Sequence, residues 1–195
     1  MGRPFRRTRA GVRVQLPADE RALLARLLDD VEGLLAEDAD EREMPKADGS
    51  PGSSVEDVLA ALEAQLTPQP PADAAVARLL PEGHREDPEL AAGFRRLTEH
   101  GLRERKRAGL ELAASALVRT EPVVLDRAEA TALLRGLTDV RLVLAERLGL
   151  RTDADAEALH RALSRAADLN DPLMAAAALY DALTWWQESL VQALH

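Results

Sequence analysis

Few side chains in this sequence have the types and spacing that catalysis or metal binding requires. The histidines are scattered without metal-ligand spacing, at His84, His100, His160 and His195. Cysteine is absent, which excludes disulfides, thiolate catalysis and cysteine-based zinc sites. We find no glycine-rich phosphate loop, no GxSxG, no HExxH and no EF-hand loop. We therefore expect no catalytic residue, no metal site, no cofactor and no enzyme activity.

Positive charge on a long helix is the most suggestive chemical feature. Asp87 followed by Pro88 predicts the start of a helix that runs to about Val118. Glu99 is the only acid among the basic residues on one of its sides, which we name the basic ridge: Arg95, Arg96, Arg103, Lys106 and Arg107. The ridge could bind an acidic protein surface or the DNA backbone. Alternatively, it is an ordinary solvated helix face whose charges are answered by acidic residues of the first helix.

The side of this helix opposite the basic ridge carries an apolar stripe. Its members recur at helical spacing, although the stripe narrows in the middle, and they are Leu90, Phe94, Leu97, Gly101, Ala108 and Leu112. Apolar residues on one side of a helix normally pack into the core. The pattern therefore predicts that this stripe is the buried face of the helix.

A second group of cations lies at the N-terminus. Residues 3–16, RPFRRTRAGVRVQL, hold five arginines and no acid, and their partial alternation around Ala10-Gly11 predicts a two-stranded hairpin. We interpret residues 1–16 as a basic hairpin arm for phosphate or an acidic partner, with Arg3, Arg6, Arg7 and Arg9 as candidate contacts. The alternative is an edge hairpin whose arginines keep it soluble or pair with the acidic run downstream.

Trp185 is the remaining candidate contact residue. The final stretch, Pro172 to His195, predicts a helix whose buried line contains Leu183, Trp186 and Leu190. Trp185 points about 100° away from Trp186, towards the polar flank. It either fills a groove beside a neighbouring helix or anchors a partner. If the protein forms a homodimer, this flank is where we expect the interface.

The composition limits the partners and the location. Of the 195 residues 46% are hydrophobic but only 3% are aromatic, which favours an aliphatic helical core. The net charge of −9 argues against nucleic acid binding over the whole surface, although a local basic patch remains possible. No apolar run is long enough to span a membrane and no secretory signal follows the N-terminal arginines, so we expect a cytoplasmic protein without a membrane partner.

These patterns predict a mainly α protein, a single-domain helical bundle of about six to seven helices with a small N-terminal β-hairpin. The single domain covers residues 1–195, with a flexible acidic and Gly-Ser-Pro linker at 38–53 and the main helical body at 54–195. A helix that Asp126 and Glu129 cap should pack against the last helix in the centre. Asp139 interrupts its apolar surface and is expected to pair with Arg135, one turn away. Helices are predicted over 17–37, 53–66, 73–80, 87–118, 126–148, 152–169 and 172–195.

Four segments together resemble the actinobacterial AosR family, long catalogued as a domain of unknown function. They are RPFRRTRAGV, RLLPEGHREDPELAAGFRRLTEHGLRERK, LLRGLTDVRLVLAERLG and LYDALTWWQESLVQAL. The resemblance implies a transcriptional regulator of the oxidative-stress response that acts with the transcription machinery. A regulator that senses oxidant through a disulfide needs cysteines, so this chain either senses nothing directly or works through a partner.

The preferred hypothesis is a non-enzymatic regulatory protein that binds another protein through the basic ridge and the hairpin arm. The first alternative is a regulator that binds DNA directly with the same arginines, but we see no helix-turn-helix with a plainly basic recognition helix. The second alternative is an accessory subunit of an enzyme, with a pocket between helices.

Overall fold

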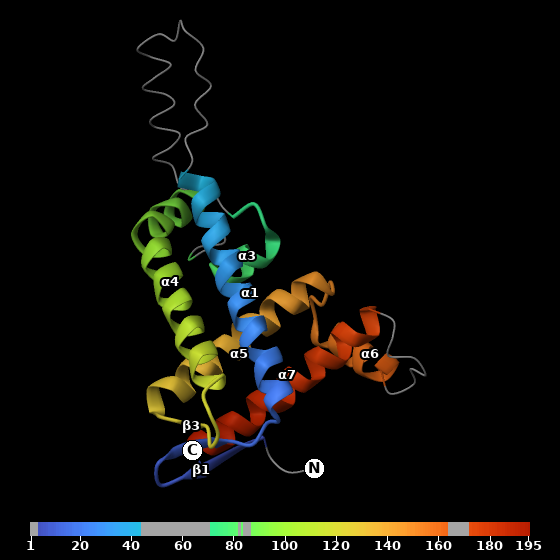
Figure 1. The fold of residues 1–195 in the computed structure, drawn as a ribbon. Coiled ribbons are helices and arrows are strands. Elements are labelled where there is room, and N and C mark those ends of the chain that lie inside the picture. The colour runs from blue at the N-terminus through green and yellow to red at the C-terminus, as the bar shows by residue number, and fades with distance from the viewer. Residues whose placement is uncertain (1–3, 44–70, 82, 84–86, 164–171) are drawn as a thin grey trace, which may run out of the picture.

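The computed structural model describes residues 4–43, 71–81, 83, 87–163 and 172–195, which form six helices and three strands (Figure 1). The mainly α fold with a small N-terminal sheet is therefore confirmed. In chain order the elements are β1 (Phe5–Thr8), β2 (Gly11–Val14), α1 (Ala18–Glu43), α3 (Ala74–Leu79), α4 (Pro88–Leu117), β3 (Val124–Leu125), α5 (Arg127–Arg147), α6 (Asp153–Leu163) and α7 (Pro172–Leu194). No helix among the described residues could cross a membrane.

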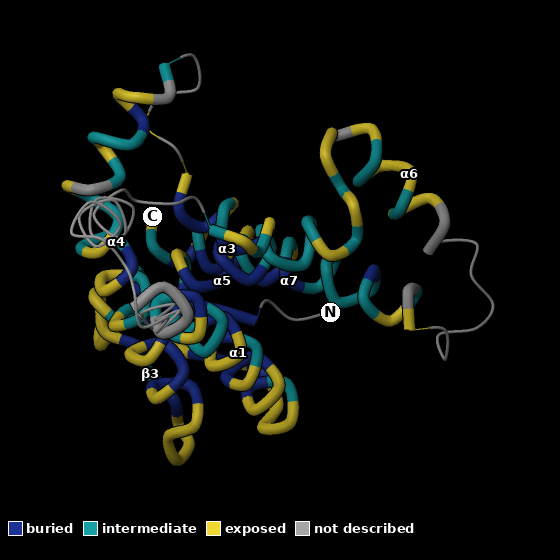
Figure 2. Tube along the Cα trace, turned by 90° about the horizontal axis from the view of Figure 1, so that it is seen from above, coloured by how far each residue is buried: buried dark blue, intermediate teal, exposed yellow. Residues whose placement is uncertain are grey.

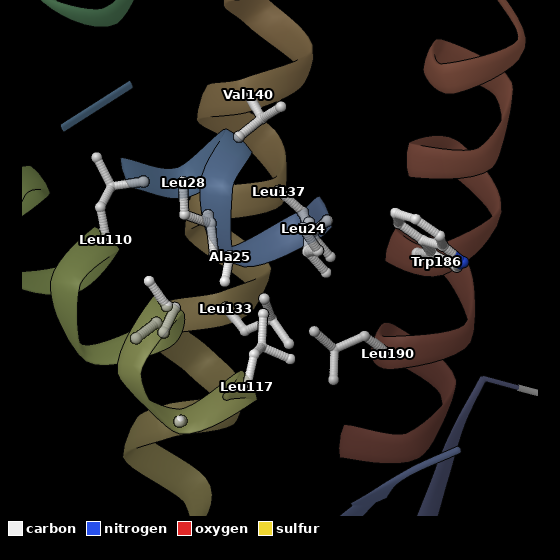
Figure 3. Packing of buried hydrophobic residues seen from close by; sticks show 14 of the residues in the cluster. Leu24, Ala25, Leu28, Leu110, Leu117, Leu133, Leu137, Val140, Trp186 and Leu190 are labelled. Atoms are coloured by element: carbon white, nitrogen blue, oxygen red, sulfur yellow. The ribbon is translucent and has the colours of Figure 1, made fainter. Parts of the chain in front are cut away.

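Leucines from four helices build the core. Helix α4 packs against both α1 and α5, and α5 packs in turn against α7, as expected from the two apolar helices (Figure 1). Figure 3 shows side chains of all four helices pointing into one cluster, which includes Leu28, Leu117, Leu137 and Leu190, each of them fully buried. Burying one such side chain contributes about 1.5–3 kcal/mol, so this cluster is the main source of stability. Figure 2 shows the buried residues gathered along α5 and α7, while α6 lies to one side with mostly exposed or half-buried residues.

The predicted hairpin is one part of a three-stranded antiparallel sheet. Phe5 pairs with Val14 and Arg6 with Arg13, and on the other side of β2 Val12 pairs with Leu125. Gly11 has a φ of +135°, and a Cβ there would lie 2.2 Å from the Leu125 carbonyl oxygen, so glycine is required where β3 approaches the turn. The extended segment before α5 thus pairs with the hairpin.

The inner face of this sheet belongs to the core. Phe5, Val12, Val14 and Leu125 are all buried, and the Phe5 amide donates to Ser189 Oγ of α7 at 3.2 Å. The N-terminal arm is therefore a docked layer at the end of the molecule where α7 ends, and only its outer face is open to solvent (Figure 1).

Helix boundaries follow the capping residues. Asp73, Asp87 and Asp126 accept hydrogen bonds from the first turns of α3, α4 and α5, and Asp126 forms the expected capping box with Glu129. The predicted linker start at residue 38 is wrong, because α1 continues to Glu43. The remainder of that linker, the predicted helix over 53–66 and the end of the helix predicted to reach residue 169 lie outside the described residues.

Helix α4 turns the opposite face to the core from the one predicted. Leu97, on the stripe expected to be buried, is 87% exposed, whereas Arg103 on the opposite side is 4% exposed. The reason lies on α1, which offers a backbone carbonyl and carboxylates to the cations of α4. Hydrogen bonds and charge pairing between the helices, at Arg103 and Arg107, fix the rotation of α4. Leucines and alanines on the same side, such as Leu110 and Ala113, complete the packing further along.

Candidate interaction surface

The outer face of the sheet presents arginines that pair with no acidic group in the part of the chain that the structure describes. Arg6 and Arg13 occupy directly opposite positions on β1 and β2, and both side chains are exposed. Arg9 lies in the turn that joins the two strands and is also exposed. None of these three guanidinium groups has a hydrogen bond or ion pair within the described part of the chain. We call Arg6, Arg9 and Arg13 the cationic sheet face.

The two opposed arginines repel each other across the strands. Like charges directly opposite on neighbouring strands destabilise a sheet, and an opposite-charge pair at the same position would contribute roughly 0.2–1 kcal/mol. The alternation of Val12, Arg13 and Val14 forces Arg13 outward, because both valines face the core. The fold therefore holds these two charges together, side by side, where water or a binding partner must solvate them.

A hollow of about 300 Å³ lies beside this face. Arg13 lines it together with Arg21, whose guanidinium is buried. Arg21 Nε donates to the Leu117 carbonyl at 3.2 Å, and Nη1 donates to the Leu16 carbonyl at 3.1 Å and pairs with Glu121. Its Nη2 group has no hydrogen-bond partner among the residues that the structure describes. Positive charge thus continues from the sheet into the hollow, balanced there by Glu121.

One of the predicted arm residues, Arg7, is not on the cationic sheet face. Arg7 Nη1 donates to the carbonyl oxygen of His195 at 2.6 Å, so this arginine ties β1 to the C-terminal end of α7. A cation at a helix C-terminus is favourable because the carbonyl ends there carry partial negative charge. Arg3 lies outside the described residues.

The basic ridge is an internal ion-pair seam between helices. Arg103 Nη1 donates to the Leu35 carbonyl at 2.7 Å, and Nη2 donates to Asp38 at 2.8 Å and to Glu99 at 2.9 Å. Glu99 also faces Arg95. A buried, fully engaged guanidinium cannot contribute to an exposed binding surface, so the assignment of Arg103 to such a surface is wrong.

The other ridge residues whose side chains the structure describes are also paired. Lys106 Nζ lies 2.6 Å from Asp139 of α5, and Arg107 Nε donates to Glu32 of α1 at 2.7 Å. The side chain of Arg96 is outside the described part of the structure. The alternative interpretation, in which acidic residues of the first helix pair with the ridge, is therefore correct for Arg103 and Arg107.

Asp139 finds a partner, but the partner is Lys106 and not Arg135. Burial raises the pKa of Asp139 above its ordinary value, and the hydrogen bond and charge of Lys106 offset this only in part. Arg141, another charged residue of α5, contacts polar and aromatic side chains of α7. It donates to Gln187 Oε1 at 2.6 Å, and its guanidinium lies 5.1 Å from the centre of the Tyr180 ring.

Trp185 remains a candidate contact residue on α7, and the histidines that the structure describes belong to no metal-binding cluster. Trp185 is 41% exposed on α7, whereas Trp186 is buried. His160 lies 2.6 Å from Asp181 and links α6 to α7. Among the described residues, no group of three or more His, Cys, Asp or Glu could hold a metal ion.

Sequence reasoning overlooked two residues of this surface. Arg13 belonged to the five N-terminal arginines, and its place between two valines was the signal that it points outward. Arg21 gave no such signal, because an arginine in the first turns of a leucine-rich helix reads as solvated. Only the packing of Leu16, Leu117 and Glu121 around it shows that Arg21 is buried.

Comparison with known proteins identifies one family. The model described as a domain of unknown function, DUF2017, matches residues 2–194. No curated protein and no solved structure matches the chain. Because the family model spans almost the whole sequence, the protein belongs to the DUF2017 family.

Proposed function

We propose that this protein is a non-enzymatic regulator that binds an acidic surface of a partner protein through the cationic sheet face. One observation carries the proposal: three exposed arginines have no ionic partner among the described residues, in a chain whose net charge is −9. On the inner side of α4, by contrast, Arg103 and Lys106 are paired with acids. Carboxylates from a partner would relieve the repulsion between Arg6 and Arg13, and bidentate arginine–carboxylate pairs are strong and directional.

The class of partner follows from the resemblance to the AosR family. On that basis the partner is a component of the transcription machinery, and the regulated process is the oxidative-stress response in the cytoplasm. A chain without cysteine cannot sense oxidant through its own thiols. In this proposal the partner, or a protein that acts on it, carries the sensing step.

The decisive experiment reverses the charge of the face without changing its internal repulsion. The double variant Arg6→Glu/Arg13→Glu keeps two like charges opposite each other, so its stability should match that of the wild type. A matched control is Arg26→Glu/Arg151→Glu, which makes the same charge change at exposed residues of α1 and of the α5–α6 connection. Affinity capture from native cells, followed by titration of the purified captured protein, should show binding at least tenfold weaker for the first variant only. Equal losses for both variants would refute a specific cationic face.

Direct DNA binding is the second candidate, and the same unpaired arginines favour it. Phosphate contacts release counterions, so each contact lowers the logarithm of the binding constant by about 0.9 per tenfold rise in salt concentration. Retention on duplex DNA at low salt that disappears in Arg6→Glu/Arg13→Glu would support this candidate. No retention of the wild type at low salt would exclude it.

A further inference from the structure

The hollow beside the cationic sheet face has a buried guanidinium in its wall. It lies next to the sheet, at the end of the molecule where α1 begins and α4 ends (Figure 1). Its volume is about 300 Å³, and its wall consists of residues 13–17, Arg21 and residues 121–123. This volume is at the lower end of the range for ligand pockets. The hollow is therefore of a size for a small polar group or for one side chain of a partner.

Arg21 has a structural role that uses only two of its three guanidinium nitrogens. Leu117 is the last residue of α4, so its carbonyl lacks a partner within that helix, and Arg21 Nε donates to it at 3.2 Å. Arg21 Nη1 donates to the Leu16 carbonyl at 3.1 Å and to Glu121. These contacts explain why the Arg21 side chain is held at only 9% exposure. They do not involve Nη2.

The Nη2 group of Arg21 opens into the hollow. It has no hydrogen-bond partner among the residues that the structure describes. It is also not one of the described polar atoms that are buried without a hydrogen bond, so it has accessible surface. Because the other two nitrogens are engaged, Nη2 is the donor that Arg21 presents to the hollow. An anionic acceptor there would form a charge-assisted hydrogen bond with a side chain that is already ordered.

The charges that line the hollow select a ligand group with one negative charge. Arg13 lines it with an exposed guanidinium that has no ionic partner among the described residues, and Glu121 lines it with a carboxylate. Two arginines and one glutamate give a net charge of about +1, which a carboxylate neutralises. A phosphate dianion would exceed this charge and would be repelled by Glu121. We propose that the hollow is a carboxylate pocket, in which an acidic side chain of the partner protein binds between Arg13 and Nη2 of Arg21.

This inference rests on the proposed function for the source of the carboxylate, and it adds a fixed anchor to that surface. Arg6 and Arg9 are exposed, so holding them in one geometry costs side-chain entropy. Two backbone carbonyls already hold the Arg21 guanidinium, so its remaining donor has a defined direction. Arginines in desolvated pockets are among the residues that carry most of the binding energy of protein interfaces.

Side-chain NMR with a model carboxylate tests the pocket without the partner. The probe is N-acetylglutamate N-methylamide, and the control is the corresponding glutamine derivative, which has the same shape but no charge. The Nε–Hε signals of Arg13 and Arg21 should shift in a saturable way with the glutamate probe and should not move with the glutamine probe. Equal shifts with both probes, or no saturable shift of the Arg21 signal, would overturn the proposal.

Two substitutions of exposed side chains should change the affinity for the glutamate probe in opposite directions. Arg13→Gln removes one cation and should weaken binding about fivefold, whereas Glu121→Gln removes the competing charge and should strengthen it about threefold. Glutamine at position 121 keeps an oxygen that can accept from Arg21. Arg6→Gln is the matched control and should leave the affinity unchanged, because Arg6 lies opposite Arg13 but does not line the hollow. Equal losses in Arg6→Gln and Arg13→Gln would show general attraction to the sheet and would overturn the pocket.

Further outcomes separate this inference from the proposed function. Loss of partner binding in Arg6→Glu/Arg13→Glu, with no response of Arg21 to the glutamate probe, would refute the pocket and leave the proposed function standing. A saturable response of Arg21 together with equal partner binding by both charge-reversal variants would support the pocket and refute the proposed function. Free glutarate that binds more than about tenfold tighter than the capped probe would identify a small dicarboxylic acid as the ligand, and would overturn the assignment to a protein side chain.

Discussion

The hairpin and α4 carry similar runs of basic residues, but the fold treats the two runs in opposite ways. The cations Arg103, Lys106 and Arg107 of α4 pair with acids of α1 and α5. These ion pairs hold the three helices together. On the sheet, Arg6 and Arg13 face away from the core and meet no acid within the described residues. The same residue types therefore serve structure in one place and remain available for binding in the other.

The difference comes from what covers each element. A helix inside a bundle has neighbours on several sides, so a long cationic side chain on its flank reaches an acid on the next helix. A sheet packed on one face only has no layer over its outer side, and strand alternation fixes which residues point there. A run of charge on a solvent-side strand is thus a better indicator of a binding surface than the same run on a bundle helix.

The largest effect should come from removing the central cation of the seam. Arg103→Met takes away the donor for Leu35 and Asp38 in a buried setting, and breaking such a pair costs about 3–5 kcal/mol. For a protein of this length the melting temperature should fall by on the order of 10 °C. Differential scanning calorimetry measures it.

The matched control for this prediction is Arg6→Met, which removes an exposed, unpaired arginine and should change stability by less than about 0.5 kcal/mol. Arg103→Lys keeps the charge but lacks the planar fork, so its loss should lie between the two. Equal melting temperatures for Arg103→Met and Arg6→Met would remove the distinction between the seam and the cationic sheet face.

A second prediction separates a charge inside the seam from a charge at the surface by their pH dependence. Burial raises the pKa of Asp139, so the folded state binds the proton of this carboxyl more tightly than the unfolded state does. The stabilisation that this proton provides is present below about pH 4, and it is lost as the pH rises through the raised pKa. Hydrogen bonds from the Arg151 and Thr152 amides lower the pKa of Asp155, and its contribution is present above the unfolded value and lost as pH falls.

Urea denaturation at several acid pH values should therefore show opposite trends. As the pH rises, the free energy of unfolding of the wild type should fall relative to that of Asp139→Asn. Over the same range it should rise relative to that of Asp155→Asn. Parallel trends for the two variants would mean that the Lys106 pair outweighs the burial of Asp139.

Local sequence signals predicted the elements of the fold well. Asp87 and Pro88 mark the start of α4, the capping box at Asp126 marks the start of α5, and Gly149, with a φ of +69°, follows the end of α5. These signals act within one turn of the chain. The acidic run after residue 37 reads as a linker for the same local reason, and only its contact with Arg103 shows that Asp38 lies within a helix interface.

The candidate site was only partly predictable because side-chain pairing depends on neighbours distant in sequence. Helix periodicity locates the two sides of α4 but does not say which of them faces α1, and here the paired charges decide it. Asp139 has Arg135 one turn away, but it pairs with Lys106, which is 33 residues distant. Strand alternation is more informative, because it sets the direction of Arg13 from Val12 and Val14 alone.

The smallest predicted effect tests whether the cationic sheet face is held under repulsion. Arg13→Glu turns the like-charge pair with Arg6 into an opposite-charge pair, so the protein should gain roughly 0.2–1 kcal/mol in urea denaturation at low salt. Arg6→Glu should give a similar gain, and the double variant should return to the stability of the wild type. High salt should shrink all of these differences, because both side chains are exposed. Single and double variants of equal stability would show that the two arginines do not repel each other, and would weaken the argument that this face awaits an acidic partner.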